Sequence, residues 1–146
     1  MKNKVARMAI AVLFAAGLMV SMSAFAQAEE HGCSLARAAG KWSFTDNGTV
    51  IGVGPRTAVG ILTLDGKGNV LNGVATSSLN GAIADETFSG TYTVNPDCTG
   101  SVVRTDGSHF SFVVTPDGSR LDSIRTDPGT VFSGTAIRMT RRLEDD

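Results

Sequence analysis

The chain has 146 residues, with 13 basic and 14 acidic side chains and a formal net charge of −1. Its charges are scattered apart from the acidic end Glu144-Asp145-Asp146, so the basic stripe that nucleic-acid binding needs is missing. The two histidines and two cysteines do not have metal-ligand spacing. We therefore predict no nucleic-acid partner, no metal and no cofactor.

Residues 1–28 have the pattern of a signal peptide. Lys2, Lys4 and Arg7 precede an apolar stretch at 8–20, which is too short to span a bilayer comfortably. Small residues then offer cleavage after Ala28, or after Ala26 as the alternative. Cleavage would leave a mature chain with a net charge near −4. We expect an exported protein, periplasmic or extracellular, with no membrane association in its mature form.

Residues 29–40 form an N-terminal segment that precedes the first predicted strand. The segment contains Cys33, and the other cysteine of the chain is Cys98. Two cysteines in an exported protein most simply form one disulfide. The predicted Cys33–Cys98 bond would tie this segment to the turn between the fourth and fifth strands.

Residues 41–141 read as an all-β domain, and residues 142–146 as an acidic tail. Turn sequences such as Asp65-Gly66-Lys67-Gly68 and Thr105-Asp106-Gly107-Ser108 recur between alternating, β-branched runs, which is a strong hairpin signal. The pattern predicts an antiparallel up-and-down barrel of about eight strands. The predicted strands are 41–46, 57–64, 69–78, 86–95, 99–105, 108–115, 119–126 and 130–140.

Residues 47–56 form the longest predicted connection. They hold Gly48, Gly52, Gly54 and Pro55, so we expect either a flexible lid over one barrel mouth or a plain long loop. A membrane-embedded barrel does not fit, because the outward strand faces carry Ser and Thr where an apolar band with aromatic girdles is needed.

The barrel interior is the candidate ligand site. An eight-stranded lumen is either filled by side chains or wide enough for one small ligand. Alternation places Phe88 and Tyr92 on one face of their strand, and Phe110 and Phe112 on one face of theirs. The candidate lumen residues are Trp42, Phe44, Phe88, Tyr92, Phe110, Phe112, Phe132 and Arg138.

Three arginines fall within predicted strands: Arg104, Arg125 and Arg138. The ordinary expectation is that they point outward. An inward arginine would need a partner, so it would indicate a buried ion pair with Asp122 or a site for an anionic ligand.

Two short motifs have simple structural interpretations. Asp65-Gly66-Lys67-Gly68 resembles a calcium loop, but Lys67 stands where an oxygen ligand is needed, so we predict a hairpin turn. Ser108 and His109 are adjacent in a strand and therefore point to opposite faces, so we predict no nucleophile–base pair and no catalytic residues.

The stretches 60–70, 89–101 and 131–136 resemble small secreted bacterial proteins of largely unknown function. Those proteins are similar to the allene oxide cyclase-like barrels, which have a calycin-type architecture. The resemblance implies a barrel over most of the mature chain. No catalytic position of the cyclases can be matched here.

Three functions stay open from the sequence. The first is a barrel that binds a small apolar ligand in its lumen. The second is a protein-interaction or inhibitor module of the periplasm. The third is an enzyme of cyclase or isomerase type, and we expect an enzyme less than a binding protein.

Overall fold

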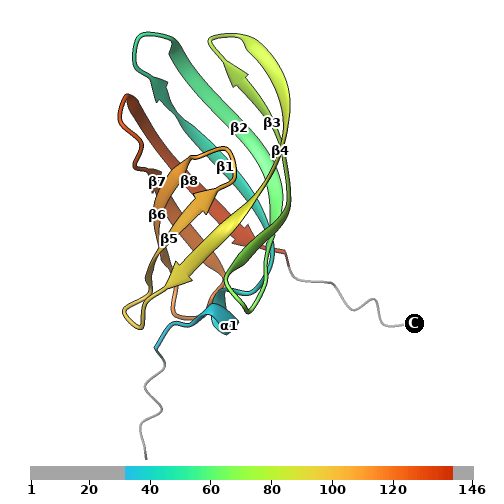
Figure 1. The fold of residues 1–146 in the computed structure, drawn as a ribbon, viewed down its shortest axis with the longest axis vertical. Coiled ribbons are helices and arrows are strands. Elements are labelled where there is room, and N and C mark those ends of the chain that lie inside the picture. The colour runs from blue at the N-terminus through green and yellow to red at the C-terminus, as the bar shows by residue number, and fades with distance from the viewer. Residues whose placement is uncertain (1–31, 140–146) are drawn as a thin grey trace, which may run out of the picture.

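A computed structural model describes residues 32–139, which form a closed antiparallel barrel with one short helix at its base (Figure 1). The predicted signal peptide and acidic tail lie outside the described residues. No helix within residues 32–139 is long and apolar enough to cross a bilayer. The elements in chain order are α1 (Leu35–Ala38), β1 (Gly40–Val50), β2 (Gly54–Leu64), β3 (Asn69–Leu79), β4 (Ala82–Val94), β5 (Thr99–Arg104), β6 (His109–Val114), β7 (Arg120–Arg125) and β8 (Thr130–Arg138).

The strand order confirms the predicted up-and-down barrel. Each strand pairs with the next one in the chain, and β1 pairs with β8 to close the sheet. The closing register runs from Trp42 opposite Arg138 to Val50 opposite Thr130. Because side chains alternate between the two faces of a strand, every second residue points into the barrel.

Four of the tight turns are stabilised by the same aspartate contact. In each turn a carboxylate oxygen accepts the backbone N–H of the residue two positions later, which is the geometry of an Asx-turn. The aspartates are Asp65, Asp97, Asp106 and Asp117. The calcium-like motif at Asp65 is therefore a hairpin turn, as predicted.

Two hairpins are longer than the sequence indicated. β1 continues to Val50 and β2 begins at Gly54, so the lid or loop predicted at 47–56 is wrong and only a three-residue turn remains. Gly48 permits this pairing, because a Cβ there would overlap the backbone at Val131 and Phe132. β4 begins at Ala82, directly after a two-residue turn of Asn80 and Gly81 that both have positive φ.

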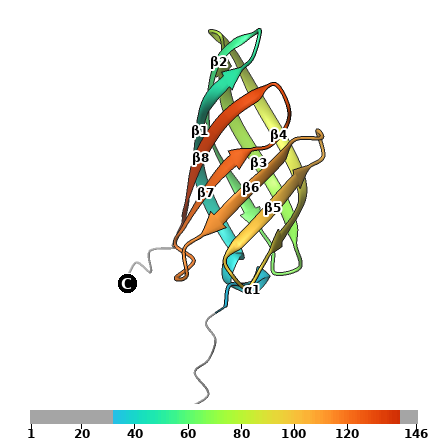
Figure 2. The same cartoon turned by 90° about the vertical axis from the view of Figure 1, so that its left-hand side faces the viewer.

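The barrel consequently has a mouth of unequal height. The β1–β2 and β3–β4 hairpins rise above the β5–β6 turn (Figure 2). The upper part of β4, from Ala82 to Thr87, pairs with β3 only, because its ladder with β5 begins at Gly90. This part of β4 is an exposed sheet edge.

The opposite end of the barrel is closed by α1. Ser34 caps the helix by accepting the N–H of Arg37. The predicted disulfide between Cys33 and Cys98 is present and holds the helix against the β4–β5 turn. This helix was not predicted from the sequence, where residues 29–40 were assigned only as an N-terminal segment.

Trp42 and Arg138 fix α1 to the barrel. The buried indole of Trp42 donates to the carbonyl of Ala38 at 3.0 Å, and the Arg138 guanidinium lies 4.8 Å from the Trp42 ring. Arg138 also donates to the carbonyls of Arg37, Ala39 and Gly118. One side chain thus joins the last strand, the helix and the β6–β7 turn.

Candidate functional site: the barrel lumen

An apolar cavity of about 90 Å³ lies inside the barrel. It is lined by aromatic and aliphatic side chains, and Asp46 and Arg104 contribute to its lining as well. An apolar cavity of about 150 Å³ is known to admit benzene, so this space suits a ligand no larger than about one ring. The lining aromatic and larger aliphatic residues are Trp42, Phe44, Leu62, Leu64, Val70, Phe88, Val102, Phe110, Phe112 and Leu121.

Five of the eight candidate lumen residues line this cavity: Trp42, Phe44, Phe88, Phe110 and Phe112. The predicted inward orientation of Phe88, Tyr92 and Phe112 is confirmed, because all three are buried. Phe44 and Phe88 meet edge to face, with their ring centroids 6.0 Å apart.

The other three candidates lie outside the cavity lining. Tyr92 packs at the closed end, where its hydroxyl lies within hydrogen-bond distance of the carbonyl oxygens of Leu35 and Asp65. Arg138 holds α1 at the same end. Phe132 is buried next to Arg56 and Arg125, each with its guanidinium carbon 5.8 Å from the ring centroid.

The expected outward orientation of the strand arginines is wrong. Arg104 alternates in phase with the cavity residue Val102, and its side chain is only 12% exposed. Arg125 and Arg138 are also partly buried. The suggested partner Asp122 binds Arg120 on the barrel exterior instead.

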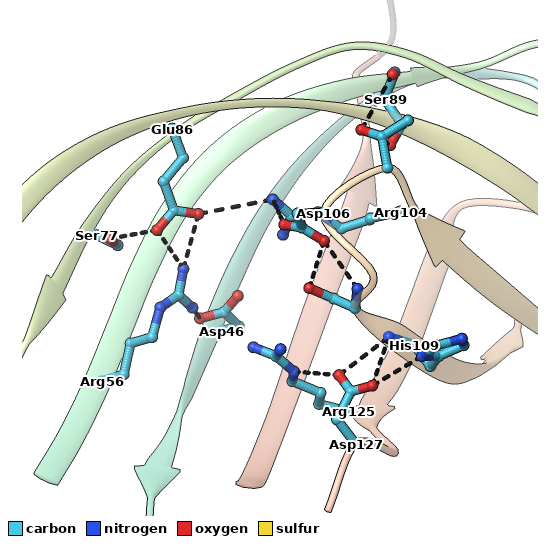
Figure 3. A network of polar contacts seen from close by, with 12 residues as sticks. Asp46, Arg56, Ser77, Glu86, Ser89, Arg104, Asp106, His109, Arg125 and Asp127 are labelled. Carbon is cyan, nitrogen blue, oxygen red and sulfur yellow. Dashed lines mark hydrogen bonds and ion pairs between the residues drawn. The ribbon is translucent and has the colours of Figure 1, made fainter. Parts of the chain in front are cut away.

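Arg104 belongs, together with Arg56, to a ring of charged side chains near the open mouth (Figure 3). Arg56 of β2 bridges Asp46 of β1 and Glu86 of β4, at 2.8 Å from each carboxylate. Arg104 of β5 binds Asp106 at 2.9 Å and lies 3.8 Å from Glu86. We call these five side chains the mouth ring.

A second ionic cluster continues around the mouth from β6 to the β7–β8 turn. Asp127 accepts from Arg125 at 2.6 Å and lies 2.8 Å from Nδ1 of His109 (Figure 3). The hydrogen bond from Arg125, together with those from His109, lowers the pKa of Asp127 to about 2.

Burial and pairing act in opposite directions on the acids of the mouth ring. Burial raises the pKa of Asp46 in spite of its ion pair with Arg56. Burial would also raise the pKa of Glu86, but hydrogen bonds from Ser77 and Arg56 outweigh it and the pKa is lowered. Burial lowers the pKa of Arg104. The ring is therefore partly desolvated, although its charges are paired.

Arg104 joins the mouth ring to the apolar cavity. Its guanidinium carbon lies 3.8 Å from the centroid of the Phe88 ring, a cation–π contact. Its Nε is buried and has no hydrogen-bond partner, which is the one such side-chain atom among residues 32–139. Arg104 and Asp46 are the two members of the ring that also line the cavity.

The Ser108-His109 motif does not bring a nucleophile and a base together, because the two side chains contact different aspartates. Ser108 donates to Asp106 at 2.6 Å, whereas the His109 ring contacts Asp127. Within residues 32–139, no group of three His, Cys, Asp or Glu side chains is placed to hold a metal ion.

Asp46, Arg56 and Glu86 were not predicted as site residues from the sequence. A signal was available, because Asp46 alternates in phase with Trp42 and Phe44, and Glu86 with Phe88. An acid in phase with core aromatic residues is a candidate for a lumen position. What alternation does not reveal is which arginine meets it from another strand.

Comparison of the chain with protein-family models and with curated proteins finds no match. Among solved structures, it is similar to a de novo designed fluorescence-activating β-barrel. That similarity has a TM-score of 0.45 and 14% identity, and covers 69% of this chain and 93% of the designed chain. At this level it gives no information about a ligand of the present protein.

Proposed function

We propose that this protein is an exported barrel that binds a small, mainly apolar molecule in its lumen. The observation that carries the proposal is a cavity lined by aromatic side chains, inside a barrel that is capped at one end. Ligand pockets typically combine an apolar lining with a few placed polar groups, which the mouth ring supplies here. The Cys33–Cys98 disulfide is compatible with export, because such bonds persist in oxidising compartments.

Toluene is a suitable probe, since one ring is the upper limit of ligand size that the cavity volume indicates. Titration of the folded protein with toluene should change Trp42 fluorescence saturably, because Trp42 lines the cavity. It should also raise the melting temperature with concentration, as any ligand selective for the native state does. Toluene that changes neither signal saturably would contradict the proposal.

Adjacent valines provide a matched pair of variants. Val102 lines the cavity, whereas Val103 points outward and is exposed. Val102→Phe should fill the cavity and abolish toluene binding, and Val103→Phe should leave binding unchanged. Equal binding by both folded variants would place the toluene site outside the lumen.

A protein-binding role is the second candidate, and the exposed edge of β4 favours it. Residues Ala82–Thr87 present unpaired backbone groups, and Ile83 within them is strongly exposed. An extended peptide can add a strand to such an edge. Protein binding would become the better supported of the two functions if the lumen bound no small molecule.

A further inference from the structure

We propose that the lumen selects a neutral ring compound that carries one hydroxyl group, with the oxygen accepting a hydrogen bond from Nε of Arg104. This inference rests on the proposed lumen-binding function and specifies the chemical class of the ligand. It is carried by an unpaired donor and a free acceptor on Arg104 and Asp46, the two charged residues that line the otherwise apolar cavity.

The donor is the Nε–H group of Arg104. A buried N–H group without a partner is costly, so a native structure that keeps one usually supplies an acceptor from water or a ligand. The other guanidinium contacts hold the side chain in place: Asp106 and Glu86 bind its Nη2 atom, and Phe88 packs against its face. The donor is therefore positioned before any ligand arrives.

The acceptor is the second carboxylate oxygen of Asp46. Arg56 donates to Oδ1, and no hydrogen bond between described residues ends on Oδ2. Asp46 and Arg104 both line the cavity. The inference requires one hydroxyl group to use both, its oxygen accepting from Arg104 while its hydrogen is donated to Asp46.

The charges of the mouth ring argue against an anionic ligand. The ring contains three carboxylates, Asp46, Glu86 and Asp106, against the two guanidinium groups of Arg56 and Arg104. A carboxylate ligand would add a further negative charge beside Asp46 in a partly desolvated site. A ketone or ether would satisfy Arg104 but leave Asp46 without a donor. The neutral hydroxyl group fits both.

The test compares three probes of similar shape: toluene, p-cresol and p-toluate. The wild-type protein should bind p-cresol about tenfold more tightly than toluene, the scale of a hydrogen bond to a charged group. It should bind p-toluate more weakly than p-cresol. Calorimetric titration gives the three affinities, and Trp42 fluorescence checks that each probe enters the lumen.

Arg104→Lys keeps the positive charge and removes the Nε–H group, so the preference for p-cresol over toluene should fall to the part that donation to Asp46 alone supplies. Arg120→Lys makes the same change in an exterior ion pair and should retain the preference. Arg104→Met serves as a second variant if the lysine variant is unfolded by circular dichroism.

The outcomes separate this inference from the proposed function. Equal wild-type affinity for p-cresol and toluene would overturn the hydroxyl inference while leaving lumen binding intact. Tighter binding of p-toluate would overturn it in favour of an anion site. Failure of all three probes to bind would contradict the proposed function itself.

Discussion

At the scale of single residues, glycines decide how closely neighbouring strands approach. Gly90 faces the barrel interior between Val70 and Arg104 in its two ladders. A Cβ built there would overlap the carbonyl oxygen of Val103 and come within 2.9 Å of Cα of Arg104. These are backbone atoms, so the strand pair itself would have to move. The absence of a side chain at Gly90 therefore also helps to position Arg104.

Gly90→Ala should lower the free energy of unfolding by about 1–3 kcal/mol, the range for forcing extra volume into a packed interior. Gly66→Ala is the matched control, because a Cβ at Gly66 meets no atom within 4 Å and its φ is not positive. The control should change stability by less than about 0.5 kcal/mol. Urea unfolding of both variants measures the difference, and equal stabilities would contradict the close approach at Gly90.

At the scale of elements, the sequence indicated all eight strands because turn chemistry is local. The aspartate turns at 65, 97, 106 and 117 place strand ends within one or two residues of those observed. The hairpin ends at 47–56 were missed, since Gly48 and Gly54 look like strand breakers when no packing partner is known. Asn80-Gly81 was also overlooked, although that dipeptide is the strongest two-residue hairpin signal.

The candidate site was only partly predictable for a related reason. Alternation along a strand identified Phe88, Phe110 and Phe112 as lumen residues. It could not show that Arg56 would meet Glu86, because that contact joins strands thirty residues apart in the chain. An isolated arginine that points inward is unfavourable because it loses its hydration, and for this reason the strand arginines were expected to point outward. That expectation was wrong because acidic side chains on other strands pair with the inward arginines.

The disulfide and α1 act together as one element that closes the base. Cys33 and Cys98 are 65 residues apart in the chain, so the chain-entropy model gives a stabilisation of roughly 4 kcal/mol. Reduction should therefore lower the urea midpoint of unfolding clearly. The Cys33→Ser/Cys98→Ser double variant should start at the lower midpoint and show no response to reductant. A wild-type midpoint that is insensitive to complete reduction would contradict this role.

At the scale of the whole molecule, stability should depend on acid pH through its many paired carboxylates. The hydrogen bond from Arg125 holds the pKa of Asp127 at about 2, and hydrogen bonds in its turn hold that of Asp117 at about 2. Each group has a higher pKa in the unfolded chain, near 3.9. Their stabilising contribution is thus complete above about pH 4 and is lost as the pH falls toward 2.

The urea midpoint should accordingly decrease between pH 4 and pH 2, and Asp127→Asn should make that decrease shallower. Asp46→Asn provides a control of opposite sign. Burial raises the pKa of Asp46, so protonation of this group favours the folded state as the pH falls toward 4. Its removal should take away that gain, which the urea midpoint records as the pH falls from neutral toward 4. Identical pH profiles for all three proteins would contradict these assignments.

The pairing of β1 with β8 also bears on how the chain folds. Seven of the eight strand pairs in the described part of the chain join consecutive strands, and such hairpins form in about 1–10 μs. The β1–β8 pair joins the two ends of the domain and bears the largest loop-closure entropy. Until it forms, the chain is an open sheet with two free edges and an exposed apolar face, the kind of species that aggregates. The time that a newly made chain spends at that risk is therefore set by a single strand pair.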